Sequence, residues 1–187
     1  GDTYHVSDTV LEKPQTISYY DLQRVRWAKG AFAPNGKMYW INTVDKNIDL
    51  KKAISDGIAK TVYEMTKIPI PLLGTKGIRF MAKSLRNWPK KHGEEKASVY
   101  LGQILRMSEE VGSGGAGFRF IYGAFLKEAG EKYDNPDLLE ASELMGRAAN
   151  KWREFAYIGA RNCKSRSKPT EDYGMLGDML KEISYME

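Results

Sequence analysis

The chain has 187 residues, of which 42% are hydrophobic and 28% are charged, and its formal net charge at pH 7 is +5. This composition suits a globular domain with a hydrophobic core and excludes a disordered chain. No apolar run approaches the roughly 20 residues of a membrane-spanning helix, and no signal-peptide pattern is present. The single cysteine excludes an internal disulfide and favours the cytoplasm, and with two distant histidines we expect no metal site.

Residues 1–45 carry short strand-like runs around one helix. Residues 3–6 and 37–42 have the aromatic and β-branched content of strands, and Ser18 is placed to cap a helix over residues 19–29. Two strands alone are marginal as a sheet, and the sequence begins with strand-like residues and without a methionine. We therefore expect residues 1–45 to be a linking segment, the remnant of a longer N-terminal half.

The apolar period changes near residue 46. From there on, apolar side chains recur every three or four residues, which is typical of amphipathic helices. The stripes predict helices over residues 49–67, 78–88, 94–111, 118–129, 136–158 and 175–183. Pro89 is expected to stop the second of these helices, and Asn135 to cap the fifth. The sequence thus predicts a mainly α protein, in which residues 46–187 form a bundle of about five to seven helices after one or two short β-strands.

A glycine-rich loop, GSGGAG at residues 112–117, satisfies the pattern G-x-G-x-x-G. A dinucleotide-binding loop needs a strand before the first glycine, whereas a helix is predicted there. A P-loop needs Lys and then Ser or Thr after the last glycine, whereas this loop continues with Phe118 and Arg119. Four glycines also exceed what a turn between two helices needs. We therefore expect the backbone here to pass close to another helix or to a ligand.

Arg119 lies in the first turn of the helix that follows this loop, where the helix dipole disfavours a cation. It makes sense there if it pairs with a carboxylate or a phosphate. Two interpretations remain open: an internal salt bridge with tight packing, or contact with a ligand or partner. Tyr122, one turn later, either lines a groove beside the loop or packs in the core. The candidate ligand-binding residues are Ser113, Gly114, Gly115, Arg119 and Tyr122.

A basic stripe recurs at helical spacing along the predicted helix around residue 80. Its members are Lys76, Arg79, Lys83, Arg86 and Lys90. The stripe is either a solvated face or a dock for an acidic helix, which electrostatic steering would favour. Nucleic acid is not expected, because no aromatic side chains are interleaved for base stacking. Cys163 has basic neighbours but no histidine nearby in sequence, so we assign it, His5 and His92 no role.

Several short motifs together resemble one group of bacterial proteins. They are GSGGAGFR at residues 112–119 with Tyr122 and the pair EA at 128–129, YHVSD at residues 4–8, and KMYWI at residues 37–41. This pattern is similar to that of the butirosin-biosynthesis H-type proteins of secondary metabolism. In these proteins a papain-like, cysteine-protease-fold half is followed by a helical domain. The resemblance covers most of the chain.

The resemblance implies an acyltransferase that moves an aminoacyl group from an acyl carrier protein thioester to an aminoglycoside amine. Asp8 matches the acidic residue that orients the catalytic histidine in such an enzyme. The chain departs from the pattern by having Thr9 where proline is expected, and it lacks the catalytic cysteine. We therefore expect this chain to be catalytically silent by itself, whether its parent is an acyltransferase or an amidase.

The implied role is to shape the substrate site, or the acyl-carrier-protein site, of an absent N-terminal catalytic half. The implied partners are that half, an acyl carrier protein and a small-molecule acyl acceptor. No cofactor is expected, and a homo-oligomer is compatible with the sequence. Two other hypotheses stay open. One is a stand-alone helical module that binds an acidic protein or a phosphorylated ligand, and the other is a small enzyme that holds such a ligand at the glycine loop.

Overall fold

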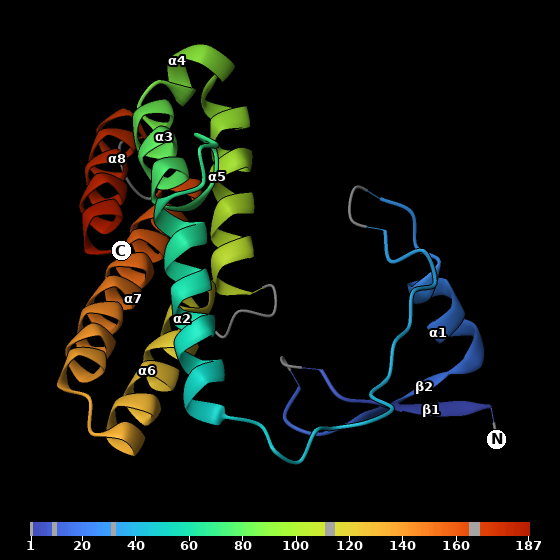
Figure 1. Ribbon diagram of the computed structural model, residues 1–187. Coiled ribbons are helices and arrows are strands. Elements are labelled where there is room, and N and C mark those ends of the chain that lie inside the picture. Colours follow the sequence, from blue (N-terminus) through green and yellow to red (C-terminus); the bar gives the residue numbers. More distant parts are fainter. Residues whose placement is uncertain (1, 9–10, 31–32, 111–114, 165–168) are drawn as a thin grey trace. The chain divides into compact units, whose positions relative to one another are not determined.

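The computed structural model describes residues 2–8, 11–30, 33–110, 115–164 and 169–187 (Figure 1). The chain divides into two compact units, Gly1–Ile48 and Asp49–Glu187. Ser113 and Gly114, two of the candidate ligand-binding residues, lie outside the described residues. Within the part of the chain that is described, no helix is long and apolar enough to cross a membrane.

The first unit holds a two-stranded antiparallel sheet and one helix. Strand β1 (Thr3–Val6) pairs with β2 (Gln15–Ser18), and Thr3 lies opposite Ser18 in the register. Helix α1 (Tyr19–Arg26) follows at once, because the Ser18 hydroxyl accepts a hydrogen bond from the Asp21 amide at 3.1 Å. The predicted strand at residues 3–6 and the Ser18 cap are therefore confirmed.

The predicted strand at residues 37–42 is wrong. These described residues form no strand, and the side chain of Tyr39 is 94% exposed. The place beside β1 is taken by residues 15–18 instead. Residues with strand propensity form a strand only where a neighbouring strand supplies hydrogen bonds and cross-strand contacts. The composition of residues 37–42 cannot show whether such a neighbour exists.

The second unit is a helical bundle. Its helices are α2 (Leu50–Thr66), α3 (Gly74–Leu85), α4 (Trp88–His92), α5 (Glu94–Glu109), α6 (Arg119–Tyr133), α7 (Pro136–Cys163) and α8 (Pro169–Met186), with a 3-10 turn η1 (Ala116–Phe118) before α6. Over the described residues this gives seven α-helices in the unit, so the mainly α prediction is confirmed. Pro89 does not stop a long helix as expected. Instead α3 ends at Leu85 and Pro89 lies in the first turn of α4, where a missing amide hydrogen costs nothing.

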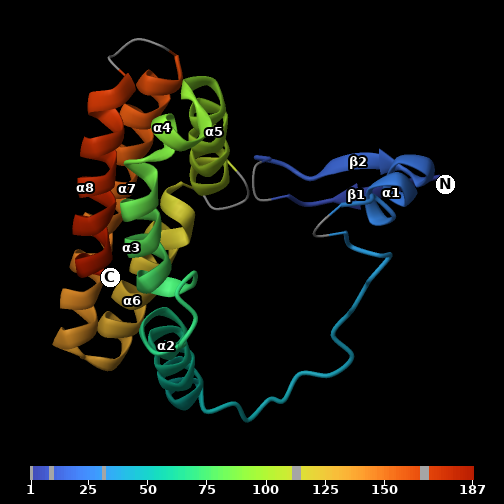
Figure 2. The same cartoon turned by 90° about the horizontal axis from the view of Figure 1, so that it is seen from above.

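The long helix α7 forms the centre of this unit. It lies beside α8, as both views show, and it also packs on α5 and α6 (Figures 1 and 2). The largest fully buried side chains are Leu85, Leu101, Phe155, Tyr173, Leu176, Leu180 and Ile183, which come from α3, α5, α7 and α8. The core therefore lies between these four helices, whereas α2 is outside it. All of α2 is described, and none of its residues is buried.

The hairpin of α6 and α7 sets the geometry on which the candidate site depends. Asn135 caps α7, since its side-chain oxygen accepts hydrogen bonds from the amides of Asp137 at 3.0 Å and Leu138 at 3.3 Å. Further along, the Ser142 hydroxyl donates to the carbonyl of Gly123 at 2.8 Å. A Cβ on Gly123 would lie 3.6 Å from the Ser142 carbonyl oxygen, so the two helix backbones approach closely there. This approach brings the first turns of α6 next to the first half of α7.

Candidate functional site

The described end of the glycine-rich loop is shaped by the side chains around it. Gly115 and Gly117 have φ angles of +91° and +53°, in a region that other residues rarely adopt. A Cβ on Gly117 would lie 2.6 Å from Nη1 of Arg119. The amide of Ala116 donates to Oε1 of Glu109 at 2.9 Å. In the described part of the loop, the groups that approach the backbone are therefore side chains of the chain itself.

Arg119 forms a bidentate ion pair with Glu187. Its Nε lies 2.8 Å from Oε1 and its Nη2 lies 2.9 Å from Oε2, while Nη1 donates to the carbonyl of Gly117 at 3.0 Å. The Arg119 side chain is 20% exposed and that of Glu187 is 2% exposed. An ion pair taken this far out of water is stable only with good geometry and further hydrogen bonds. Arg119 thus takes part in an internal salt bridge, one of the two interpretations that the sequence left open.

Trp152 of α7 completes this cluster. Its indole Nε1 donates to Oε1 of Glu187 at 2.7 Å, and the centre of the Arg119 guanidinium lies 4.8 Å from the centroid of the Trp152 ring. The carboxylate therefore receives hydrogen bonds from both side chains, and the cation rests on an aromatic face. Sequence reasoning missed Glu187, because no local pattern links an acidic residue to an arginine 68 positions earlier.

A cavity of about 320 Å³ opens beside this cluster. It lies between α2 and the first turns of α6, with α7 behind. Its apolar walls are made by Val62, Met65, Phe118 and Met145, and its polar groups come from Thr61, Thr66, Arg119, Tyr122 and Glu187. Arg119 and Tyr122, both candidates from the sequence, are thus brought to one cavity, whereas Gly115 is buried and does not line it.

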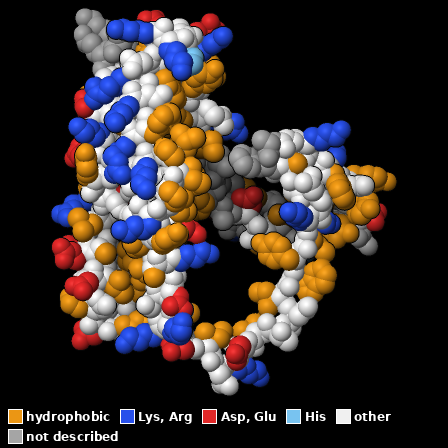
Figure 3. Space-filling view, turned by 45° about the horizontal axis from the view of Figure 1, so that its top comes forward, with side chains coloured by type: hydrophobic (Ala, Val, Ile, Leu, Met, Phe, Trp, Pro, Cys, Tyr) orange, Lys and Arg blue, Asp and Glu red, His pale blue; other side chains and the backbone are white. Residues whose placement is uncertain are grey.

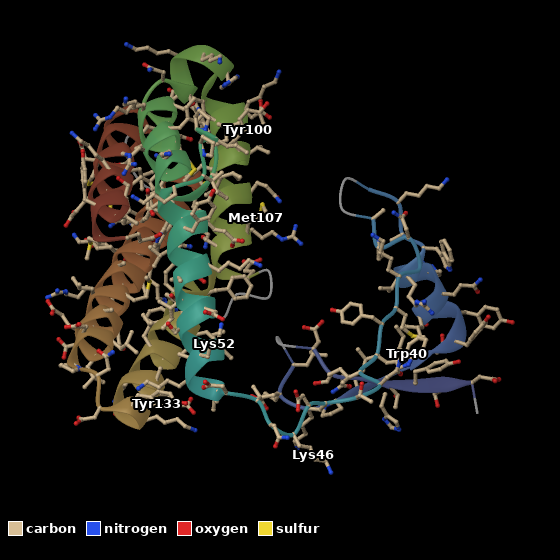
Figure 4. All side chains as sticks on the ribbon, in the orientation of Figure 1. Trp40, Lys46, Lys52, Tyr100, Met107 and Tyr133 are labelled. Atoms are coloured by element: carbon tan, nitrogen blue, oxygen red, sulfur yellow. The ribbon has the colours of Figure 1, made fainter. Side chains whose placement is uncertain are left out.

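Helix α2 forms one wall of this cavity without belonging to the core. The Lys51 ammonium lies 5.8 Å from the centroid of the Tyr133 ring, which links the first turn of α2 to the end of α6. Figure 4 labels Tyr133 at that end of α6. The apolar stripe of α2 is only partly covered, and Ile54, Ile58 and Met65 are half-buried. Of this stripe, Val62 and Met65 line the cavity.

Tyr122 lines the cavity from α6. Burial raises the pKa of Tyr122 above its usual value, and a hydrogen bond with Thr61 lowers it by less. The ring stacks on that of Phe125 with 5.8 Å between their centroids. The phenol therefore stays protonated at neutral pH, and its ring is held by an aromatic neighbour on α6.

Asp8, the candidate for orienting a histidine, lies elsewhere. It is an exposed residue just after β1 in the first unit, and its carbonyl accepts a hydrogen bond from the Leu11 amide at 3.2 Å. The structure does not place it in the unit that holds the cavity.

Cys163 is half-buried near the end of α7. Its thiol donates to the carbonyl of Ser98 at 3.4 Å. The ring of His92 packs against that of Tyr100, at 5.4 Å between centroids. The described residues contain no group of three or more His, Cys, Asp or Glu side chains that could hold a metal ion. The contacts of Cys163 and His92 are thus those of packing residues.

The basic stripe lies along α3 and continues onto a neighbouring helix. Figure 3 shows Lys and Arg side chains gathered over the face of the helical unit that is turned to the viewer. Arg79 donates to the carbonyl of Ser184 at 3.4 Å, and Arg86 forms an ion pair with Asp178, so α8 engages both arginines. Lys181 of α8, which sequence reasoning missed, lines a shallow hollow together with Lys83, Arg79 and Arg86.

The fold and the cavity define a class of protein: a mainly α domain with an apolar pocket between its helices. The chain belongs to the family described as "Domain of unknown function (DUF4872)", which matches residues 20–187. That match includes all of α1 except its first residue, Tyr19, and the whole of the helical unit. No curated protein and no solved structure matches the chain.

Proposed function

We propose that this chain is the non-catalytic, helical part of a papain-like acyltransferase or amidase relative of bacterial secondary metabolism, and that it acts in the cytoplasm. Its role is to shape the site for an acyl substrate. The observation that carries the proposal is the cavity of about 320 Å³ with largely apolar walls, which is lined by Gly117, the last residue of the glycine-rich loop. Pockets of this size and character bind small organic groups.

The charge of the cavity supports an acyl group over a phosphorylated ligand. A phosphate needs a cation with free hydrogen-bond donors. The guanidinium of Arg119 already holds the Glu187 carboxylate through two nitrogens at 2.8 and 2.9 Å. A phosphate brought to this guanidinium would lie beside the Glu187 carboxylate, which is 2% exposed and also held by Trp152, so the two anions would repel each other. The uncharged end of an acyl substrate would not be repelled by the Glu187 carboxylate.

The surroundings of Cys163 support a silent domain. Its thiol donates to a backbone carbonyl, and no histidine hydrogen bond activates it among the contacts of the described residues. The test is hydrolysis of a short acyl thioester by the 187-residue chain, for which we expect no turnover above buffer. Turnover that disappears in Cys163→Ala would contradict the proposal. A second test is the coding sequence upstream of Gly1, where we expect a cysteine and a histidine at papain-like spacing.

A second candidate function is docking of an acidic protein, such as an acyl carrier protein, on the basic stripe. It is favoured by the hollow between α3 and α8, which Lys83 and Lys181 both line. Lys83 also lines a second hollow on the other side, with Lys76. Juxtaposed cations of this kind speed the approach of an acidic partner and make its affinity depend on salt.

The docking test measures the affinity of the chain for an acidic acyl carrier protein at rising salt. We expect the double variant Lys83→Glu with Lys181→Glu to lose most of the binding. Arg86 is left intact, because its ion pair with Asp178 and its packing against Gly177 would confuse the result. The control carries the same charge change at Lys96 and Lys132, which are exposed on α5 and α6. Equal losses in both double variants would refute a specific dock.

A further inference from the structure

The hollow between α3 and α8 is crowded with cations. Its volume is about 150 Å³, and none of the described residues that line it is acidic. Arg79, Lys83 and Arg86 line it from α3 and the residue after it, and their spacing of three to four places them on one helical face. Lys181 lines it from α8. Four positive charges therefore meet at one small hollow.

Of these four cations, one is paired with a carboxylate among the described residues. Arg86 forms an ion pair with Asp178 of α8. Lys83 and Lys181 are exposed, and neither forms an ion pair with a described carboxylate. The two lysine ammonium groups are therefore available to an anion from solution.

Arg79 is held in place by uncharged groups. Its Nη1 donates to the carbonyl of Ser184 and its Nη2 to the hydroxyl of Thr75, each at 3.4 Å. These contacts orient the guanidinium, but neither acceptor carries a charge. With Lys83 and Lys181, Arg79 thus brings to the hollow a third positive charge that no described carboxylate offsets through an ion pair. A bound anion would relieve the mutual repulsion of these three cations.

A glycine allows the two helices to bring these cations together. A Cβ on Gly177 would lie 2.8 Å from the carbonyl oxygen of Ala82 and 3.0 Å from Cγ of Arg86, so α8 approaches α3 closely there because position 177 has no side chain. Lys181 follows Gly177 by one helical turn and therefore lies on the same face of α8. Helix packing, and not a loop, builds the hollow.

We propose that this hollow binds the charged end of a small molecule that carries a diphosphate or two neighbouring phosphoryl groups. A phosphate monoester carries about −1.5 to −2 charges at neutral pH, so two phosphoryl groups offset about three cations. Guanidinium groups bind phosphate oxygens through parallel hydrogen bonds, and lysines act as point charges beside them.

The size of the hollow agrees with such an end group. Its volume of about 150 Å³ equals about five water volumes of roughly 30 Å³, which suits the phosphoryl groups and leaves the rest of the molecule at the rim. Tyr185, which lines the hollow and is 71% exposed, offers an aromatic surface there. The inference rests on the second candidate function only in taking this hollow as an anion site.

Isothermal titration calorimetry of the 187-residue chain with inorganic diphosphate tests the inference. Orthophosphate at the same ionic strength is the comparison, since it has a single phosphoryl group. We expect diphosphate to bind at least about tenfold more tightly than orthophosphate, because it contacts more of the cations at once.

Two exposed lysines locate the site. Lys83→Gln and Lys181→Gln should each weaken the binding of diphosphate by about three- to tenfold, as the loss of one charged contact allows. Both side chains are exposed, so the variants should fold like the parent, which circular dichroism checks. The matched controls are Lys96→Gln and Lys132→Gln, which make the same charge change at exposed positions on α5 and α6 and should leave the affinity within about twofold.

The phosphoryl groups can belong to a soluble molecule or to a lipid headgroup, and sedimentation with vesicles separates these sources. The vesicles contain phosphatidylcholine alone or phosphatidylcholine with phosphatidic acid, whose headgroup is a phosphate monoester. A headgroup ligand predicts sedimentation with the second kind alone, and loss of it in the double variant Lys83→Gln with Lys181→Gln. A soluble ligand predicts binding of diphosphate without sedimentation.

The outcomes separate this inference from the second candidate function. If neither diphosphate nor the phosphatidic acid vesicles bind, the inference is overturned, whereas docking of an acidic protein stands or falls by its own titration. Equal weakening of diphosphate binding in the lysine variants and in the controls also overturns it, because the net charge of +5 would then account for the attraction. Orthophosphate that binds as tightly as diphosphate excludes a site for two phosphoryl groups.

Discussion

The buried carboxylate of Glu187 gives a direct test of how the cavity end of the bundle is held together. Replacing Glu187 with alanine removes the bidentate partner of Arg119 and the acceptor of the Trp152 indole. Removing one partner of a buried ion pair costs about 3–5 kcal/mol. Arg119 keeps 20% of its side chain exposed and its bond to the Gly117 carbonyl, so water and backbone recover part of that loss. We expect a loss of about 2 kcal/mol in the free energy of unfolding.

Thermal unfolding followed by far-ultraviolet circular dichroism measures this loss. For a chain of this size, about 2 kcal/mol corresponds to a fall of roughly 4–8 °C in Tm. Glu187→Gln keeps an acceptor for Trp152 and loses only the charge, so its Tm should lie between those of the parent and Glu187→Ala.

The control is Asp178→Ala, which removes the partner of Arg86 on the surface. The side chains of that pair are 41% and 68% exposed, and an exposed pair contributes about 0–1 kcal/mol. Its Tm should therefore fall by at most about 2–4 °C. Equal shifts for Glu187→Ala and Asp178→Ala would show that burial of the Arg119 pair adds nothing, and the reasoning would be wrong.

Three further predictions concern packing in the helical unit. Tyr173 is 1% exposed and its hydroxyl has no hydrogen-bond partner among the described residues, so Tyr173→Phe should raise the free energy of unfolding by about 1 kcal/mol in urea denaturation. Burial raises the pKa of Tyr173 to about 12, and Cys163 and Glu94 add to the shift. The stability that the protonated Tyr173 contributes is therefore complete below pH 10, the usual tyrosine pKa, and is lost between pH 10 and about 12. Over that window the parent should lose more stability than Tyr173→Phe. In Gly146→Ala the new Cβ would meet nothing within 4 Å, so the variant should stabilise α7 by about 0.5–1 kcal/mol. In Gly77→Ala the new Cβ would lie 2.5 Å from the Leu72 carbonyl oxygen, so the variant should destabilise the fold by about 1–3 kcal/mol. Both changes are measured as shifts of Tm. Phe155→Ala, at a fully buried position, should cost about 3–5 kcal/mol in the same assay, and a loss below about 1 kcal/mol would contradict the assignment of the core.

The helices could be predicted from the sequence because their signals are local. The apolar stripes, the cap at Asn135 and the cap at Ser18 each lie within a few residues of the element that they define. The prediction of a strand at residues 37–42 was wrong because a strand depends on a signal that is not local. A strand is defined by its neighbour, and the neighbour of β1 turned out to be residues 15–18, a run with weaker strand composition.

In the candidate site, too, residues with a local sequence signal could be predicted, and residues brought in by the fold could not. Arg119 and Tyr122 were found because they follow an unusual loop in the chain, and an arginine in the first turn of a helix calls for an anion. The anion itself, Glu187, lies 68 residues away, and Thr61, which lines the cavity together with Tyr122, comes from α2. Only the folding of three helices around one cavity brings these groups together, so no spacing rule could identify them.

At the described end of the glycine-rich loop, Gly117 and Arg119 are coupled to the ion pair with Glu187. A phosphate loop keeps its backbone amides and its cation free for the ligand. Here Arg119 folds back so that Nη1 reaches the carbonyl of Gly117, and a Cβ at that position would lie 2.6 Å from the same nitrogen. The glycine therefore makes room for a cation that serves the protein itself. Because Glu187 pairs with that cation, the two opposite charges that line the cavity offset each other.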